Sequence, residues 1–85
     1  MKIFAQLAYP LNGYDKDKEK VKGLKADLYE VDRIDIGQSH SSFTIKGKHE
    51  MFNTVQFEFY DEHGNEADIF KMPEFNPYLQ QRHSK

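Results

Sequence analysis

The sequence predicts a mainly β fold: a single small domain built on an antiparallel meander of four or five strands. A short helix near residues 15–24 would make it a β-rich α+β fold. Apolar residues alternate with polar ones over short segments, which is the period of a strand with one buried face. The links between these segments are too short for crossover helices, so neighbouring strands are expected to run antiparallel. Seven Phe and five Tyr supply the large apolar area that a core needs in a chain of 85 residues.

Residues 2–9 fit both a strand and a helix by the spacing of their apolar side chains. A strand is favoured, because Pro10 and the turn-forming pair Asn12-Gly13 end the segment after only eight residues. Residues 14–25 then alternate in charge and contain few apolar side chains. They predict either the short helix or a lysine-rich loop, and both would leave most of the segment in solvent.

The second strand is expected at residues 28–37, where the apolar pattern changes phase. Tyr29 and Val31 occupy odd positions, whereas Ile34 and Ile36 occupy even positions. A regular strand would place these two pairs on opposite faces. Either both faces are covered, or one extra residue forms a bulge that returns the isoleucines to the core. We predict the bulge, because the acidic residues between the pairs suit solvent better than a second buried face.

Residues 52–70 are expected to form a β-hairpin with an aromatic face. In its first strand Val55, Phe57 and Phe59 alternate with polar residues, so these three side chains are predicted to be buried. A turn rich in glycine and asparagine then leads to a second strand at residues 66–70. The alternating polar side chains of the first strand would face solvent or an interface: these are Gln56 and Glu58.

Two further segments complete the expected fold. Residues 43–45 read as a short third strand between polar turns. After Phe70, Pro73 and Pro77 prevent regular strand pairing, although the segment remains apolar. We expect it to pack back over the sheet or to reach across to a second copy, and a homodimer would bury the remaining apolar surface.

Composition restricts the class of protein. With no cysteine, the chain cannot form disulfides or thiolate metal sites, and a cytoplasmic location is expected. No apolar run approaches the roughly 18 residues of a membrane helix, and the N-terminus lacks the apolar region of a signal peptide. The expected organisation is one domain at residues 1–79 with a frayed polar tail at residues 80–85.

The sequence contains no constellation that would support catalysis. His40 lies among serines, but adjacent residues of one turn cannot both orient a base and provide an oxyanion site. Residues 61–72 resemble a calcium loop only in composition, since the glycine stands at the fourth position and the twelfth residue is Met72. No phosphate loop or dinucleotide fingerprint is present. We therefore expect no enzyme, no metal site and no cofactor.

A non-catalytic protein that binds a protein partner remains as the expected function. Spaced carboxylates on the second strand could imitate a phosphate array and bind a basic protein, and the apolar tail could contribute rings. Nucleic-acid binding through residues 16–25 is the alternative, although interleaved acids offset the lysines. Small-molecule binding is a further alternative. The candidate partner-binding residues are Asp27, Glu30, Asp32, Asp35, Phe75 and Tyr78.

The runs YEVDRIDIGQSHSSFTI, FNTVQFEFYDEHGNEADIF and FNPYL, within residues 28–79, resemble small uncharacterised proteins encoded by prophages and mobile elements of Gram-positive bacteria. This resemblance carries no catalytic residues. It implies a setting in which small proteins bind and modulate a host or phage protein. The function expected from it is a phage- or mobile-element-encoded modulator of a host protein.

Overall fold

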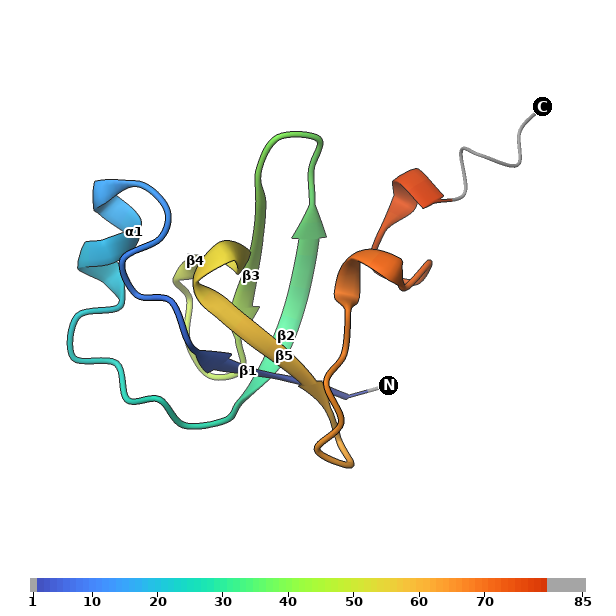
Figure 1. Ribbon diagram of the computed structural model, residues 1–85, viewed down its shortest axis with the longest axis horizontal. Helices are drawn as coiled ribbons and strands as arrows, with labels where there is room; N and C mark the ends of the chain where they lie inside the picture. Colours follow the sequence, from blue (N-terminus) through green and yellow to red (C-terminus); the bar gives the residue numbers. More distant parts are fainter. Residues whose placement is uncertain (1, 80–85) are drawn as a thin grey trace.

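The computed structural model describes residues 2–79 and confirms a mainly β fold (Figure 1). The helix expected near residues 15–24 is present but shorter, and the expected frayed tail at residues 80–85 lies outside the described residues. The elements in chain order are β1 (Ile3–Leu7), α1 (Asp15–Lys20), β2 (Tyr29–Ile36), β3 (Ser41–Ile45), β4 (Met51–Asn53), the 3₁₀ helix η1 (Thr54–Gln56), β5 (Phe57–Asp61) and the 3₁₀ helix η2 (Ile69–Lys71).

The strands form one five-stranded antiparallel sheet in the order β4-β3-β2-β1-β5. Strands β1 to β4 follow one another as neighbours, which confirms the predicted meander. Strand β5 does not continue it at the β4 edge. Instead, the chain crosses the molecule through η1, and β5 pairs along the full length of β1, with Phe59 opposite Ala5.

The sheet is strongly curved, so that its two ends face each other across one core. Strands β2 and β1 separate β3 from β5 in the sheet order. Even so, the ring of Phe43 on β3 lies 4.8 Å from the ring of Phe57 and 5.1 Å from that of Phe59, both nearly edge-on. Phe52 on β4 lies 5.8 Å from Phe57. Four buried phenylalanines therefore fill the space that the curved sheet encloses.

The bulge predicted in the second strand is confirmed. The register between β2 and β3 shifts between Val31 and Arg33, so that Val31 pairs with Ile45 whereas Arg33 pairs with Thr44. Tyr29 and Glu30, before this point, pair with β1, and the residues after it pair with β3 alone. The bulge thus lies where the strand leaves one half of the curved sheet for the other, which is the bend that such an insertion produces.

A hairpin was predicted at residues 52–70, and the prediction is wrong at the centre of its first strand. Residues 54–56 form η1, so Val55 is 50% exposed and Gln56 is fully buried, the reverse of the expectation. The side chain of Asn53 accepts a hydrogen bond from the backbone N–H of Val55 at 3.2 Å, and this cap favours the turn over an extended strand. The burial expected for Phe57 and Phe59 is confirmed.

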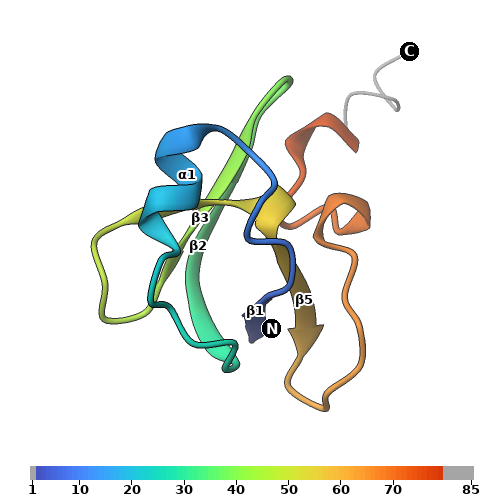
Figure 2. The same ribbon diagram turned by 60° about the vertical axis from the view of Figure 1, so that its left-hand side comes forward.

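The second strand expected at residues 66–70 is replaced by a single bridge between Tyr60 and Glu66. The backbone N–H of Ala67 also donates to the oxygen of Phe59 at 2.8 Å. This segment runs along the outer side of β5 in Figure 2, where it is drawn in orange. It therefore covers the outer edge of β5.

The apolar tail folds back onto its own domain, one of the two arrangements expected. Ile69 in η2 is buried in the core, and Met72 and Phe75 pack against it. No helix in residues 2–79 has the length and apolar character needed to cross a membrane.

Candidate functional site

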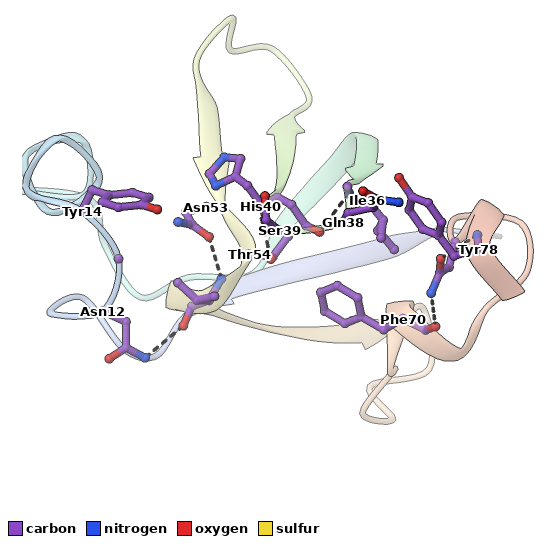
Figure 3. A pocket seen from close by; sticks show the side chains of 15 residues that line it. Asn12, Tyr14, Ile36, Gln38, Ser39, His40, Asn53, Thr54, Phe70 and Tyr78 are labelled. Carbon is purple, nitrogen blue, oxygen red and sulfur yellow. Dashed lines mark hydrogen bonds between the residues drawn. The ribbon is translucent and has the colours of Figure 1, made fainter.

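A groove of about 900 Å³ is the main hollow that the described residues form, and four separate segments of the chain line it (Figure 3). They are the loop between β1 and α1, the loop between β2 and β3, the start of η1, and the C-terminal segment. The lining residues are Asn12, Gly13, Tyr14, Ile36, Gly37, Gln38, Ser39, His40, Ser41, Asn53, Thr54, Val55, Phe70, Asn76 and Tyr78.

The first wall is held in place by the buried carboxylate of Asp17, which is only 3% exposed. Its Oδ2 accepts hydrogen bonds from the backbone N–H of Tyr14 at 2.9 Å and from Nδ2 of Asn53 at 3.0 Å. Gly13 has a φ of +86°, and a Cβ at this position would lie 2.9 Å from the same Oδ2. Only glycine fits this approach, which brings Tyr14 to the edge of the groove.

The carboxyl group of Asp17 stays ionised although it is buried. Burial by itself raises the pKa of this carboxyl. The hydrogen bonds from Asn53 and Tyr14, together with the positive charges of Lys20 and Lys16, outweigh that effect and hold the pKa below its ordinary value of 3.8. Asp17 is therefore ionised at neutral pH, and it binds both donors as a carboxylate.

The second wall is a tight turn between β2 and β3. The backbone N–H of Gly37 donates to the oxygen of His40 at 3.1 Å and to Oγ of Ser41 at 3.3 Å. A Cβ on Gly37 would lie 2.5 Å from the oxygen of His40, so the turn requires glycine. The three side chains at its tip, Gln38, Ser39 and His40, are exposed.

Asparagine side chains fix the rest of the groove. Nδ2 of Asn12 donates to the backbone oxygen of Val55 at 3.1 Å and so connects the first wall to η1. Nδ2 of Asn76 donates to the oxygen of Phe70 at 2.7 Å, and its Oδ1 accepts from the N–H of Tyr78 at 3.0 Å. The backbone around the groove is thus held by hydrogen bonds within the chain.

The groove carries no Asp, Glu, Lys or Arg among its fifteen lining residues, although 31% of the chain is charged. It exposes apolar surface instead: Tyr14 is 65% exposed, Val55 50% and Phe70 42%. Depletion of charge together with exposed aromatic rings is characteristic of the core of a protein interface. Within residues 2–79, the imidazole of His40 makes no hydrogen bond to a serine or a carboxylate.

The structure separates the two aromatic candidates from the sequence analysis. Tyr78 lies in the groove beside Phe70. Phe75 does not, because its ring packs against the core and lines a separate hollow of about 280 Å³ with Ile3 and Val31. The two candidate rings therefore line different hollows.

The acidic candidates lie away from the groove. Two of them are paired: Glu30 with Lys46 at 3.6 Å and Asp35 with Arg33 at 3.1 Å. The others, Asp27 and Asp32, are exposed, the first in the loop before β2 and the second at the bulge. Two of the four spaced carboxylates considered from the sequence therefore lie beside a cation.

The lysine segment is also partly neutralised. Lys18 lies 3.6 Å from Asp15, and Lys22 lies 3.0 Å from Glu19. Nζ of Lys20 donates to the backbone oxygen of Met51 at 2.7 Å, on the outer edge of β4. Across the described part of the chain, His, Asp and Glu side chains form no group of three or more that could hold a metal ion.

Of the fifteen lining residues only Tyr78 was a candidate from the sequence, and the exposed hydrophobic residues Tyr14, Val55 and Phe70 were not. The alternation around Val55 predicted burial, and the 3₁₀ helix that turns this side chain outward depends on the cap from Asn53. Tyr14 begins a segment that was expected to be either a short helix or a loop, and Phe70 was expected to end a strand. Their common surface exists only because the fold brings the two segments together.

Comparisons with known proteins place this chain among phage proteins. The family described as bacteriophage T4 protein Y07B matches residues 2–81, a range that includes the whole groove. A relative from Enterobacteria phage T4, described as an uncharacterised 11.2 kDa protein in the segB-ipI intergenic region, is 35% identical over 81 residues. That alignment covers 86% of this chain and 85% of the relative. No solved structure matches the chain.

Proposed function

This chain belongs to the bacteriophage T4 protein Y07B family, and we propose that it is a phage-encoded, non-catalytic protein that binds a protein partner through the groove. The observation that carries the proposal is the absence of charged side chains from all fifteen lining positions in a highly charged chain. Desolvating such a surface costs little, because no ion loses its hydration when a partner covers it.

Other functions are less well supported by the same surface. A nucleic-acid site needs lysines or arginines against the phosphates, and the groove has none. A small-molecule site commonly has this volume but encloses most of its ligand. Here the ring of Tyr14 is 65% exposed, which suits a large partner that completes the enclosure. An enzyme would need an acid, a base or a nucleophile with an orienting partner, and the groove supplies no such pair.

The proposed setting is the cytoplasm of a bacterium that carries the phage, where the protein would modulate a host protein. The resemblance to small proteins of Gram-positive prophages implied a Gram-positive host. The relative named above comes from a phage of enterobacteria, so the proposal is made for bacterial hosts without that restriction.

Site-specific photo-cross-linking tests the proposal. A photoreactive phenylalanine analogue is placed at Val55, which is half exposed in the groove, and the protein is produced in the bacterial host. The matched control carries the analogue at Leu28, which is 56% exposed but does not line the groove. We expect a discrete protein adduct from position 55 and none from position 28. Equal labelling from both positions, or none from position 55, would contradict the proposal.

The same experiment separates a foreign partner from a second copy. The segment around Ala67 covers the β5 edge, and Lys20 occupies one backbone oxygen of β4, which weakens the case for a dimer through strand pairing. We therefore propose that the protein is a monomer before it meets its partner. An adduct with the mass of two copies of this chain would assign the groove to a homodimer instead.

A further inference from the structure

The two tyrosines of the groove differ from the other tyrosines in how their hydroxyl groups are used. The hydroxyls of Tyr9, Tyr29 and Tyr60, outside the groove, each donate a hydrogen bond to a protein oxygen at 2.8–3.1 Å. Those of Tyr14 and Tyr78 have no hydrogen-bond partner in the described part of the chain. A phenolic hydroxyl can both donate and accept, and its rigid ring loses little entropy on binding.

The turn between β2 and β3 also carries polar side chains that make no hydrogen bond within the described residues. Its backbone is fixed by the hydrogen bonds of Gly37, whereas the side chains of Gln38, Ser39 and His40 make no hydrogen bond within residues 2–79. The groove therefore combines walls that are already ordered with polar groups that are not yet engaged. Such preorganisation lowers the entropic cost of binding.

These polar groups lie along a line. Figure 3 shows Tyr14 and Tyr78 at opposite ends of the groove, with Ser39 and Gln38 between them and Phe70 on the same side as Tyr78. An extended polypeptide presents a backbone donor and acceptor at every residue, and it can meet polar groups along the whole line.

The absence of Asp, Glu, Lys and Arg from the lining determines which extended segments can bind. A Lys, Arg, Asp or Glu side chain bound here would lose its hydration without gaining an ion-pair partner, and that arrangement is strongly unfavourable. Apolar and uncharged polar side chains meet no such penalty. They can pack on the exposed faces of Tyr14, Val55 and Phe70.

We propose that the groove binds an extended, uncharged segment of the partner protein, with Tyr14 and Tyr78 at its two ends. Their hydroxyls and the side chains of Gln38, Ser39 and His40 bind the backbone of the segment, and its apolar side chains pack against Val55 and Phe70. This inference rests on the proposed function, since it specifies which part of a partner the groove recognises.

A library of random short peptides displayed on filamentous phage tests the inference. It is panned against the immobilised protein, and enriched peptides are synthesised and titrated by calorimetry. We expect enriched peptides to contain a core free of Lys, Arg, Asp and Glu. Tyr14→Phe and Tyr78→Phe should each weaken binding by about two- to tenfold, as expected for one lost hydrogen bond. Tyr29→Phe removes a hydroxyl that is bonded inside the protein, and this control should bind with unchanged affinity.

Several results would overturn the inference. They are failure to enrich any peptide, enrichment of charged peptides, and equal affinity for the tyrosine variants and the control. Mass spectrometry of the adduct at position 55 separates this failure from that of the proposed function. If the cross-linked partner segment is charged or helical, a partner binds the groove but the extended, uncharged segment is wrong.

Discussion

Replacement of Asp17 by alanine should destabilise the protein and loosen the first wall of the groove. The substitution removes two hydrogen bonds to a carboxylate, at 2.9 and 3.0 Å, and leaves Nδ2 of the buried Asn53 without an acceptor. Hydrogen bonds to charged groups contribute about 1.5–3 kcal/mol each. The desolvation of the carboxylate offsets part of that gain, so we expect a net loss of about 2–4 kcal/mol in the free energy of unfolding. A domain of this size has little more than that in total.

Two matched variants isolate the cause. Asp17→Asn keeps an oxygen that can accept the same two hydrogen bonds but removes the charge, so its cost should be about 1 kcal/mol. Asp15→Ala removes a carboxylate from the same helix, but that side chain is fully exposed and its ion pair with Lys18 is long, at 3.6 Å. Loss of this exposed pair should change the free energy of unfolding by less than about 0.5 kcal/mol.

The effect should depend on pH in a defined direction. The folded protein holds the pKa of Asp17 below its ordinary value of 3.8, so the ionised carboxylate stabilises the fold at any pH above that value. This contribution is lost as the pH falls below about 4 towards the lowered pKa of the folded state. Urea denaturation, followed by far-ultraviolet circular dichroism, should be carried out at pH 7 and near pH 3. The difference in the free energy of unfolding between wild type and Asp17→Asn should be smaller near pH 3 than at pH 7. A loss below about 0.5 kcal/mol for Asp17→Ala at pH 7 would refute the reasoning, as would a gap that stays constant with pH.

The remaining predictions concern the core and the rival function. Phe57→Ala should cost about 3–5 kcal/mol, because its ring contacts Phe43 and Phe52 in the closed core. Val55→Ala, two positions earlier, should change the free energy of unfolding by less than about 0.5 kcal/mol, because that side chain is half exposed. Equal costs for the two variants in urea denaturation would show that residue 55 is buried. In fluorescence anisotropy the protein should not bind single-stranded or duplex DNA near physiological salt, and glutamine at the lysines of residues 16–22 should change nothing. Salt-sensitive, micromolar binding would support the nucleic-acid alternative.

Local features of the sequence were sufficient to predict the strands and their faces where the period was regular. The phase change between Val31 and Ile34 predicted a bulge because side chains alternate strictly along a strand, and the register shift confirms it. The strand expected within residues 2–9 is also present as β1, although it ends at Leu7, three residues before Pro10. Both features depend only on neighbouring residues.

The path from β4 to β5 and the groove depended on residues far apart in the chain. The alternation around Val55 is compatible with a strand, but β5 pairs with β1, some 50 residues earlier, and the chain must turn at η1 to reach it. That turn buries Gln56 and exposes Val55. Only then do Tyr14, Phe70 and Tyr78 meet around one uncharged surface. The sequence alone therefore predicted most of the extended segments and the apolar side chains available to the core, but not the turn at η1 or the single bridge at Glu66. The tertiary structure decided which apolar side chains remain exposed. The pairing of β5 with β1 and the closure of the core require a turn at residues 54–56, and the local alternation of apolar residues does not reveal that turn.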